Sequence, residues 1–271
     1  MKDTWDRLIS RAEWLASERH ESAELLVFYT ALLQSQKQIY EQLRSSTLST
    51  SQGSQTQCLL SGALEQDIPV LRSMMRALLK TVESNGPDLL ARNAQDLLQA
   101  SGNDRDQLLI DYWREPSDLN FFAKAFLQPY FRLLADMGVR PCDRNLGSGD
   151  NRCPFCEGKP QVSVLQIKDA SSESGGRDLI CATCLTRWPF RRVACASCGE
   201  ENPERVGYYH SPEYDHIRVE ACDSCKHYIK GVDLTRYGRA EPLVDEVAAA
   251  ALDLWARERG YTKIEMNLLG V

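Results

Sequence analysis

In the first half of the chain, apolar residues recur every three or four positions, which is the spacing of amphipathic helices. These stripes predict helices over residues 5–15, 25–39, 68–82, 89–98 and 121–137. We interpret the stripes as the inward faces of a helical bundle. Gly138 should end the last helix, and Pro129 should kink it.

Residues that start or stop helices separate the stripes. The expected boundaries are residues 17–22, a Ser/Thr/Gln-rich loop over residues 45–56, Gly86-Pro87, Gly102 and a cap at Ser117-Asp118. After the bundle, proline, glycine and aspartate crowd residues 139–152, which predicts a linker.

Beyond residue 153 the pattern changes to short runs rich in β-branched and aromatic residues, which is typical of strands. Two hairpins are predicted, with strands over residues 161–167 and 177–180 and over residues 205–210 and 216–220. After Gly231 the period becomes helical again. A single helix is expected to open at Glu241-Pro242 and to end at Gly260.

Eight of the ten cysteines lie in four C-x-x-C pairs, and these pairs carry the candidate chemistry. The pairs are Cys153/Cys156, Cys181/Cys184, Cys195/Cys198 and Cys222/Cys225. Two thiolates three residues apart can bind one metal ion from a tight turn (a knuckle), and two such turns complete a tetrahedral site. The sequence therefore predicts two metal ions, each bound by four cysteines.

The spacing of the knuckles indicates a tandem repeat. Residues 157–180 separate the first two pairs, a gap of 24 residues, and residues 199–221 separate the last two, a gap of 23. This spacing is close to that of zinc sites, and sequential pairing of the knuckles needs only local hairpins. Pairing of the first knuckle with the third, and of the second with the fourth, is the alternative. Four thiolates suit zinc and mononuclear iron equally well.

Disulfides are the competing interpretation of the cysteines. Met1-Lys2-Asp3-Thr4 leads directly into an amphipathic pattern, so no signal peptide is predicted and the thiols are expected to stay reduced. His210, His216 and His227 are expected to be ordinary histidines, because eight cysteines already complete two ligand shells. Cys58 and Cys142 are expected to be free thiols.

Aromatic and basic residues surround the knuckles. We expect the aromatic residues Phe155, Trp188, Tyr208 and Tyr209 to shield the sulfurs and to fill the small cores. Two interpretations of the basic residues remain open: they soften the negative charge of the thiolates, or they form solvated strand faces. These basic residues are Lys159, Arg187, Arg191, Arg192 and Lys226.

The predicted fold class is α+β, with a helical bundle, two tandem rubredoxin-like or zinc-ribbon modules and a C-terminal helix. The predicted domains are residues 1–138 (helical), 139–152 (linker), 153–190 (first module), 191–235 (second module) and 240–271 (C-terminal helix and tail). A chain of 271 residues has room for about two domains. The net charge of −6 argues against a nucleic-acid partner, and the apolar runs are too short for membrane insertion.

The four knuckles, a helical region before them and an Ala/Leu-rich helix after them resemble the formate dehydrogenase accessory protein family, FdhE. The likeness is closest over residues 153–270, especially at the last knuckle (residues 218–230), at residues 242–246 and at the tail over residues 267–270. The N-terminal half is similar only in its helical character, and the serine-rich stretch near residues 45–54 departs from the family.

This resemblance implies a cytoplasmic, rubredoxin-like protein that favours iron and contacts the catalytic subunit of formate dehydrogenase during its maturation. It implies no catalytic turnover and no small-molecule substrate. Fully ligated metals leave no open coordination position, and no Ser/His/Asp spacing, phosphate-binding glycine loop or metallopeptidase motif is present in the sequence. The alternatives are a zinc-ribbon adaptor for nucleic acid and a small electron-transfer protein.

Overall fold

The computed structural model describes residues 4–48, 63–140, 149–167 and 175–270. The chain divides into two compact units, Met1–Leu26 with Gly147–Val271, and Val27–Leu146. Cys58, Cys142, most of the predicted Ser/Thr/Gln-rich loop, most of the predicted linker and most of the first hairpin's turn lie outside the described residues.

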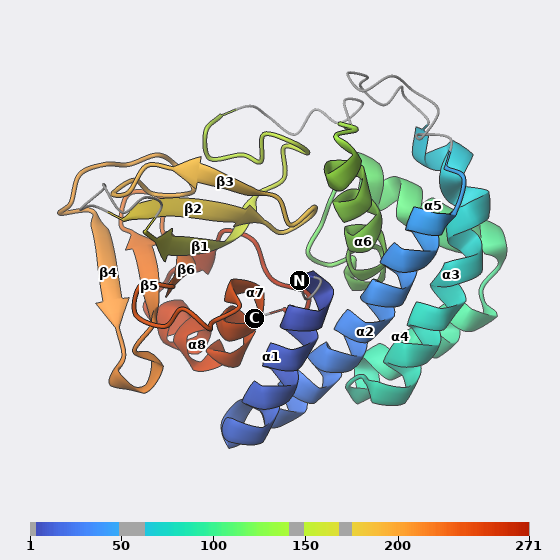
Figure 1. Ribbon diagram of the computed structural model, residues 1–271, viewed down its shortest axis with the longest axis horizontal. Helices are drawn as coiled ribbons and strands as arrows, with labels where there is room; N and C mark the ends of the chain where they lie inside the picture. Colours follow the sequence, from blue (N-terminus) through green and yellow to red (C-terminus); the bar gives the residue numbers. More distant parts are fainter. Residues whose placement is uncertain (1–3, 49–62, 141–148, 168–174, 271) are drawn as a thin grey trace. The chain divides into compact units, whose positions relative to one another are not determined.

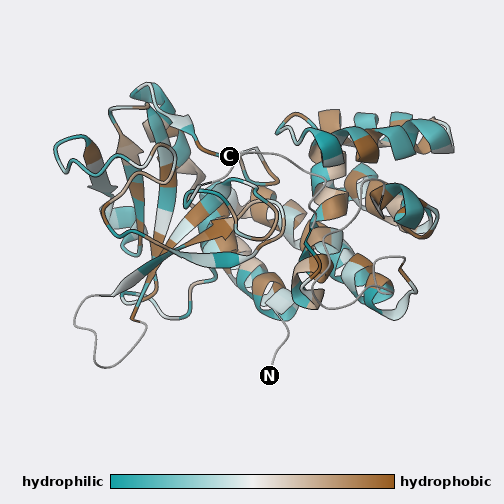
Figure 2. Ribbon diagram, turned by 90° about the horizontal axis from the view of Figure 1, so that it is seen from above, coloured by the Kyte–Doolittle hydropathy of each residue, from teal (hydrophilic) through white to brown (hydrophobic). Residues whose placement is uncertain are grey.

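The unit Val27–Leu146 is helical, as the apolar stripes predict (Figure 1). Its helices are most of α2 (Ala23–Ser45), α3 (Ala63–Asn85), α4 (Asp88–Gln99), α5 (Gly102–Arg114) and α6 (Phe121–Met137). Hydrophobic and hydrophilic residues alternate along these helices in Figure 2. The rings of Trp113 and Phe131 stack 4.8 Å apart in the core. None of the described helices is long and apolar enough to cross a membrane.

Helix α5 and the start of α6 differ from the prediction. The sequence pattern indicated no helix after Gly102, because the buried face of α5 includes the polar residues Arg105 and Asp106. The hydroxyl of Ser101 accepts the amide of Asp104, and the Asp104 carboxylate accepts the amide of Ser101, which forms a capping box. Helix α6 begins after Asn120 rather than at the predicted Ser117-Asp118 cap, and it ends at Gly138 as predicted, with φ of 72°.

The other unit is built around one mixed sheet (Figure 1). Its strands are β1 (Pro160–Gln166), β2 (Gly176–Cys181), β3 (Arg187–Phe190), β4 (Val206–His210), β5 (Ile217–Cys222), β6 (His227–Asp233) and β7 (Thr262–Lys263). The order across the sheet is β3-β2-β1-β6-β5-β4, and β7 pairs with β6. The predicted hairpins are β1–β2 and β4–β5, both antiparallel.

A third strand extends each hairpin and follows its second knuckle: β3 pairs with β2, and β6 pairs with β5. The two three-stranded modules then join through parallel pairing of β1 with β6, where Val162 lies opposite Lys230 and Val164 opposite Val232. The tandem modules predicted from the sequence therefore share one sheet. Strands β3, β6 and β7 were not predicted.

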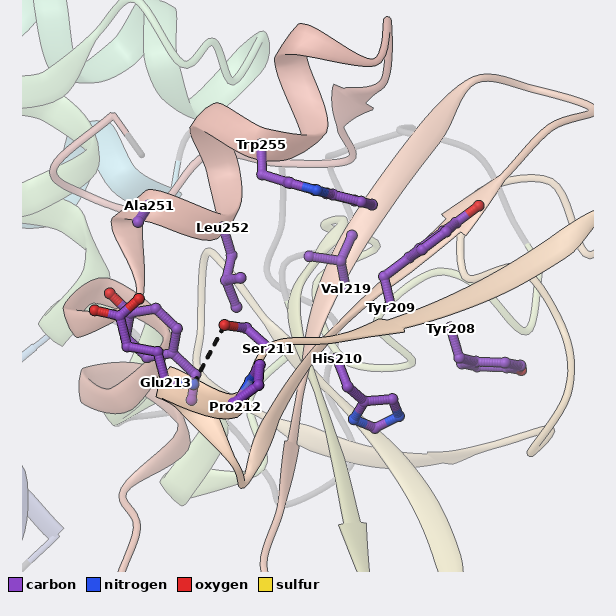
Figure 3. A pocket seen from close by; sticks show the side chains of 11 residues that line it. Tyr208, Tyr209, His210, Ser211, Pro212, Glu213, Val219, Ala251, Leu252 and Trp255 are labelled. Carbon is purple, nitrogen blue, oxygen red and sulfur yellow. Dashed lines mark hydrogen bonds between the residues drawn. The ribbon is translucent and has the colours of Figure 1, made fainter.

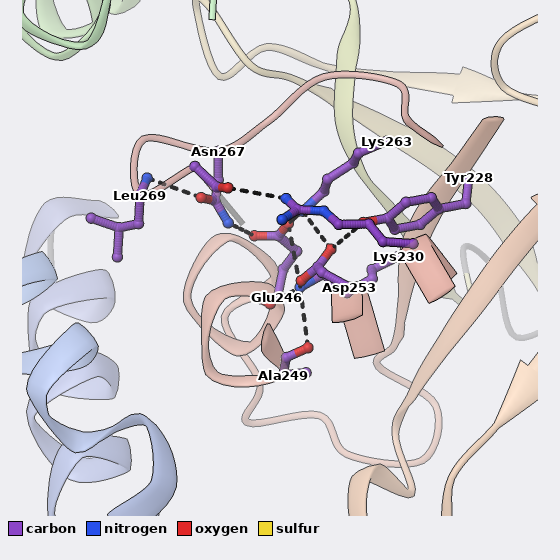
Figure 4. A network of polar contacts seen from close by, with 10 residues as sticks. Tyr228, Lys230, Glu246, Ala249, Asp253, Lys263, Asn267 and Leu269 are labelled. Carbon is purple, nitrogen blue, oxygen red and sulfur yellow. Dashed lines mark hydrogen bonds and ion pairs between the residues drawn. The ribbon is translucent and has the colours of Figure 1, made fainter. Parts of the chain in front are cut away.

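Two short helices, α7 (Pro242–Ala248) and α8 (Ala250–Glu258), replace the single predicted C-terminal helix and lie against the sheet (Figure 1). The break falls at Ala249, whose ψ of 41° is not helical. The buried ammonium of Lys230, on β6, donates to the carbonyls of Glu246 and Ala249 at this break (Figure 4). Lys230 therefore supplies donors to carbonyls at the end of α7.

Four buried charges balance around this point (Figure 4). Lys230 and Lys263 each form ion pairs with both Glu246 and Asp253, and all four side chains are at most 1% exposed. Burial lowers the pKa of Lys230, and the two carboxylates only partly offset this effect. The network ties β6, β7, α7 and α8 together, although the sequence pattern did not predict it.

Helix α1 (Thr4–Glu18) packs on α7 through a buried ion pair. The Arg11 guanidinium donates to both carboxylate oxygens of Asp245, at 2.9 Å and 2.5 Å, and His216 Nε2 lies 2.8 Å from the same carboxylate. These interactions group α1 with the sheet. The predicted helical domain over residues 1–138 remains a sequence-based proposal.

Replacing Lys230 with methionine should destabilise the unit that contains the sheet by about 3–5 kcal/mol, because two buried carboxylates lose a counter-charge. Chemical denaturation of the full chain measures this change. The matched control is Arg236→Met, because Arg236 pairs with Asp215 at the surface and its loss should cost less than about 1 kcal/mol. Equal effects of the two substitutions would contradict the importance of the buried network.

Candidate metal centres

The structure brings the eight predicted cysteines into two groups of four. Their sulfur atoms lie within 4.8 Å of one another in each group. The first group is Cys153, Cys156, Cys181 and Cys184, and the second is Cys195, Cys198, Cys222 and Cys225. This is the sequential pairing favoured from the spacing of the knuckles.

The distances between sulfur atoms fit a tetrahedral metal site. Neighbouring Sγ atoms from different knuckles lie 3.4 Å to 3.5 Å apart in the first cluster and 3.7 Å to 3.8 Å apart in the second. Metal–sulfur bonds of about 2.3 Å in a tetrahedron require sulfur atoms about 3.8 Å apart. Each cluster could therefore hold one ion that accepts four thiolates, and the donor set does not distinguish zinc from iron.

All four knuckles share one backbone geometry. The residue after the second cysteine has a positive φ in every knuckle, and its amide donates to the carbonyl of the first cysteine at 2.9 Å to 3.2 Å. These residues are Glu157, Leu185, Gly199 and Lys226. A left-handed residue turns the chain sharply enough to aim both thiols at one point. Only one of the four positions is glycine, so the other three store modest backbone strain.

Gly158 lies against the sulfurs of the first cluster. A Cβ atom at this position would lie 2.9 Å from Cys181 Sγ and from Thr183 Oγ1. Both distances are below what real side-chain contacts show, so the cluster is packed against bare backbone here. The carbonyl of Gly158 also accepts the amide of Cys153 at 2.9 Å, which closes the first knuckle.

The environments of the thiols differ. Burial raises the pKa of the Cys184 thiol well above its ordinary value, and hydrogen bonds with the other sulfurs of its cluster raise it further. Burial also raises the pKa of Cys195, although backbone amides oppose the shift. Burial acts in the same direction on Cys222, but the amides of Cys225 and Ser224 and hydrogen bonds with the sulfurs of Cys195 and Cys198 together outweigh it, so the pKa is lowered. A metal ion must displace the protons of thiols whose pKa is raised, so it would bind more tightly as pH rises.

A buried ion pair joins the two modules beneath the second cluster. Glu220, on β5, pairs with Arg177, on β2, and accepts the hydroxyl of Ser163, on β1, at 2.8 Å. Its side chain crosses β6 at Gly231, where a Cβ would lie 2.5 Å from the carboxylate. Arg177 also donates to the carbonyl of Ala194, at 2.7 Å, directly before Cys195. A side chain of the first module therefore positions a knuckle of the second.

The ion pair also fixes the ionisation of Glu220. Burial alone would raise the pKa of its carboxyl group, but Arg177, Arg218 and the hydrogen bonds to the carboxylate outweigh burial and lower it. No sequence pattern singled out Arg177 or Glu220, because their pairing depends on β1 and β6 lying side by side.

The residues predicted to surround the sulfurs have different roles. Trp188 is buried and Tyr208 packs against the second cluster, but Tyr209 points into a groove. The basic residues pair with acids or carbonyls: Lys159 with Glu265, Arg187 with Asp178, Arg191 with Asp150 and Glu201, Arg192 with the Gly175 carbonyl, and Lys226 with Asp223. Neither cluster includes a histidine.

An open groove of about 520 Å³ lies between the β4–β5 hairpin and α8 (Figure 3). Its walls include Tyr209 and Trp255, whose ring centroids are 4.8 Å apart. Ser211 and His210 also line it, but Ser211 lies just beyond the end of β4, and Figure 3 shows the two side chains apart. The Ser211 hydroxyl accepts the amide of Glu213 at 3.3 Å. The groove therefore does not assemble a serine nucleophile with a histidine base.

These features define an α+β protein with a helical unit and two tandem rubredoxin-like or zinc-ribbon modules, each with a cluster of four cysteines. Residues 152–192 match the model of the FdhE central domain, and residues 193–269 match that of the FdhE C-terminal domain. Residues 152–269 therefore match the central and C-terminal domains of the FdhE family.

Relatives and a solved structure show the same likeness. A protein FdhE homolog from Aquifex aeolicus is 38% identical over 152 residues, 56% of this chain and 52% of the relative. A homolog from Pectobacterium atrosepticum is 26% identical over 72% of this chain and 63% of the relative. This chain thus spans about half to two-thirds of the length of these curated relatives.

The crystal structure of the FdhE protein from Pseudomonas aeruginosa has the same fold. It superposes with a TM-score of 0.71 over 99% of this chain and 96% of that chain, at 21% identity.

Replacing Gly158 with alanine should destabilise the sheet unit by about 1–3 kcal/mol, because a methyl group would collide with the sulfur of Cys181. Gly238→Ala is the control, since the nearest atom to its added Cβ is 3.6 Å away. Denaturation of both variants beside the unsubstituted chain measures the effect. If the Gly158 substitution left the free energy of unfolding unchanged, the first cluster would not be tightly packed.

Replacing Glu220 with glutamine should weaken the fold most above about pH 5. The lowered pKa of Glu220 means that its stabilisation is complete above its unfolded pKa of about 4.3, and disappears as pH falls through the folded value. At neutral pH the loss should be about 3–5 kcal/mol, because Arg177 loses its counter-charge.

Denaturation as a function of pH tests this expectation. The exposed Glu201, which pairs with Arg191, provides the control substitution Glu201→Gln. Loss of metal in acid affects both variants, so their difference isolates the buried carboxylate. A deficit of the Glu220 variant that stays constant down to about pH 3 would contradict the assignment.

Proposed function

We propose that this protein is an accessory factor for the maturation of formate dehydrogenase. In this role it binds the catalytic subunit of that enzyme and holds two metal ions, one in each four-cysteine cluster. The observation that carries the proposal is the gathering of eight cysteines into two complete ligand sets, within the residues that match the FdhE family.

The coordination chemistry favours a binding protein over an enzyme. Four cysteines fill a tetrahedral shell, so neither cluster would keep the open position that a catalytic metal needs for water or substrate. We propose that the protein has no catalytic turnover and acts in the cytoplasm, where its cysteines remain reduced. Iron is the proposed metal, because the family resemblance favours it, and zinc is the alternative.

Co-purification tests the proposed partner. Cells that make both the tagged chain and a formate dehydrogenase catalytic subunit should yield the subunit in the bound fraction, in clear excess over cells that make the tag alone. The variant Cys198→Ser/Cys225→Ser shows whether binding depends on the second cluster. No enrichment of the subunit with the unsubstituted chain would contradict the proposal.

Nucleic acid and electron transfer need separate experiments. The net charge of −6 predicts no appreciable binding to duplex DNA or RNA at low salt, as measured by fluorescence anisotropy. Tight, salt-dependent binding would favour the adaptor alternative. A reversible iron–thiolate absorption band in protein purified without oxygen would support iron, whereas a colourless, zinc-loaded protein would exclude an electron carrier.

A further inference from the structure

We propose that the two clusters have different roles toward their metal ions. The second cluster exchanges its ion with soft ligands in solution, of the thiolate or imidazole class, whereas the first cluster retains its ion as a fixed part of the fold. This inference rests on the proposed binding of metal by both clusters, and it concerns the surroundings of the cysteines.

The first cluster is closed to solvent. Its four cysteines are each at most 1% exposed. Gly158 packs its backbone onto the sulfurs, and the thiol of Cys184 lies 3.1 Å from the hydroxyl of Thr186. A ligand from solution would reach an ion here only after a knuckle had opened.

The second cluster is open on one side. Cys198 is exposed and Cys225 is partly exposed, while Cys195 and Cys222 are buried. Glu200 takes the place that Gly158 has in the first cluster, since its carbonyl accepts the amide of Cys195 at 2.8 Å. Its exposed carboxylate accepts the Ser224 hydroxyl, at 2.7 Å, and nearby amides. Cys198 itself stays exposed beside these contacts.

This difference in access determines the route of metal exchange. An incoming ligand must bond to the ion while a protein thiolate leaves and takes up a proton from water. At the second cluster, Cys198 can leave while the other three sulfurs still hold the ion. At the first cluster, the same step requires local unfolding, and the required opening slows the reaction.

The second module has supports that would keep its knuckles in place during exchange. Arg177 holds the carbonyl of Ala194 next to Cys195, and its partner Glu220 lies two residues before Cys222. The hydrogen bond from Ser224 to Glu200 links the third and fourth knuckles directly. These contacts do not involve the metal, so departure of the second ion would leave a site able to bind again.

Metal release from the full chain tests the inference. Protein loaded with zinc is mixed with an excess of the chromogenic chelator 4-(2-pyridylazo)resorcinol, and zinc transfer is followed by absorbance. We expect zinc to be released in two phases, each of one equivalent of zinc per chain. The rate of the fast phase should exceed that of the slow phase by roughly tenfold or more. Cys198→Ser should abolish the fast phase, and the matched substitution Cys156→Ser should abolish the slow phase.

Alkylation provides a second measurement that needs no variant. A short pulse of N-ethylmaleimide on the zinc-loaded chain, followed by mass spectrometry, should label Cys198 and Cys225 well before the cysteines of the first cluster. Earlier or equal labelling of any first-cluster cysteine (Cys153, Cys156, Cys181 or Cys184) would overturn the inference.

The outcomes separate this inference from the proposed function. Release of two equivalents at one common rate, or a fast phase that persists in Cys198→Ser, overturns the inference but leaves metal binding intact. A folded chain that takes up no zinc or iron overturns both.

Discussion

The meeting of four sulfur atoms at each of two points is the constraint on which the sheet unit depends. Each cluster joins the two ends of a hairpin, because one knuckle precedes the first strand and the other follows the second strand. Binding an ion would therefore close the hairpin and hold its register at the same time. Strained left-handed residues such as Leu185 are tolerated because this turn must aim two thiols at one point.

Two clusters of buried charges join the duplicated modules and the C-terminal helices into one unit. Parallel pairing of β1 with β6 brings the modules edge to edge, and the Arg177–Glu220 ion pair crosses this junction on one face of the sheet. On the other face, Lys230 anchors α7 and α8 at the break between them. A deeply buried charge is stable only when an opposite charge and hydrogen-bond partners lie beside it. In both clusters these partners come from several strands and helices.

The sequence predicted what local spacing controls. The C-x-x-C pairs and the two nearly equal gaps correctly indicated which knuckles meet, because each cluster closes over a single hairpin. Parallel pairing of β1 with β6 has no such local signal, since β2 to β5 lie between these strands in the chain and neither strand is unusual alone. Helix α5 escaped prediction because Arg105 and Asp106 interrupt its apolar face, although the Ser101–Asp104 capping box was readable.

The most direct test of this account is X-ray absorption spectroscopy at the metal edge, together with the metal-to-chain ratio, on the full chain purified without oxygen. The account predicts two ions per chain, each with four sulfur neighbours at about 2.3 Å. A metal-free chain that keeps the folded sheet, or ions with nitrogen or oxygen ligands in place of sulfur, would contradict it.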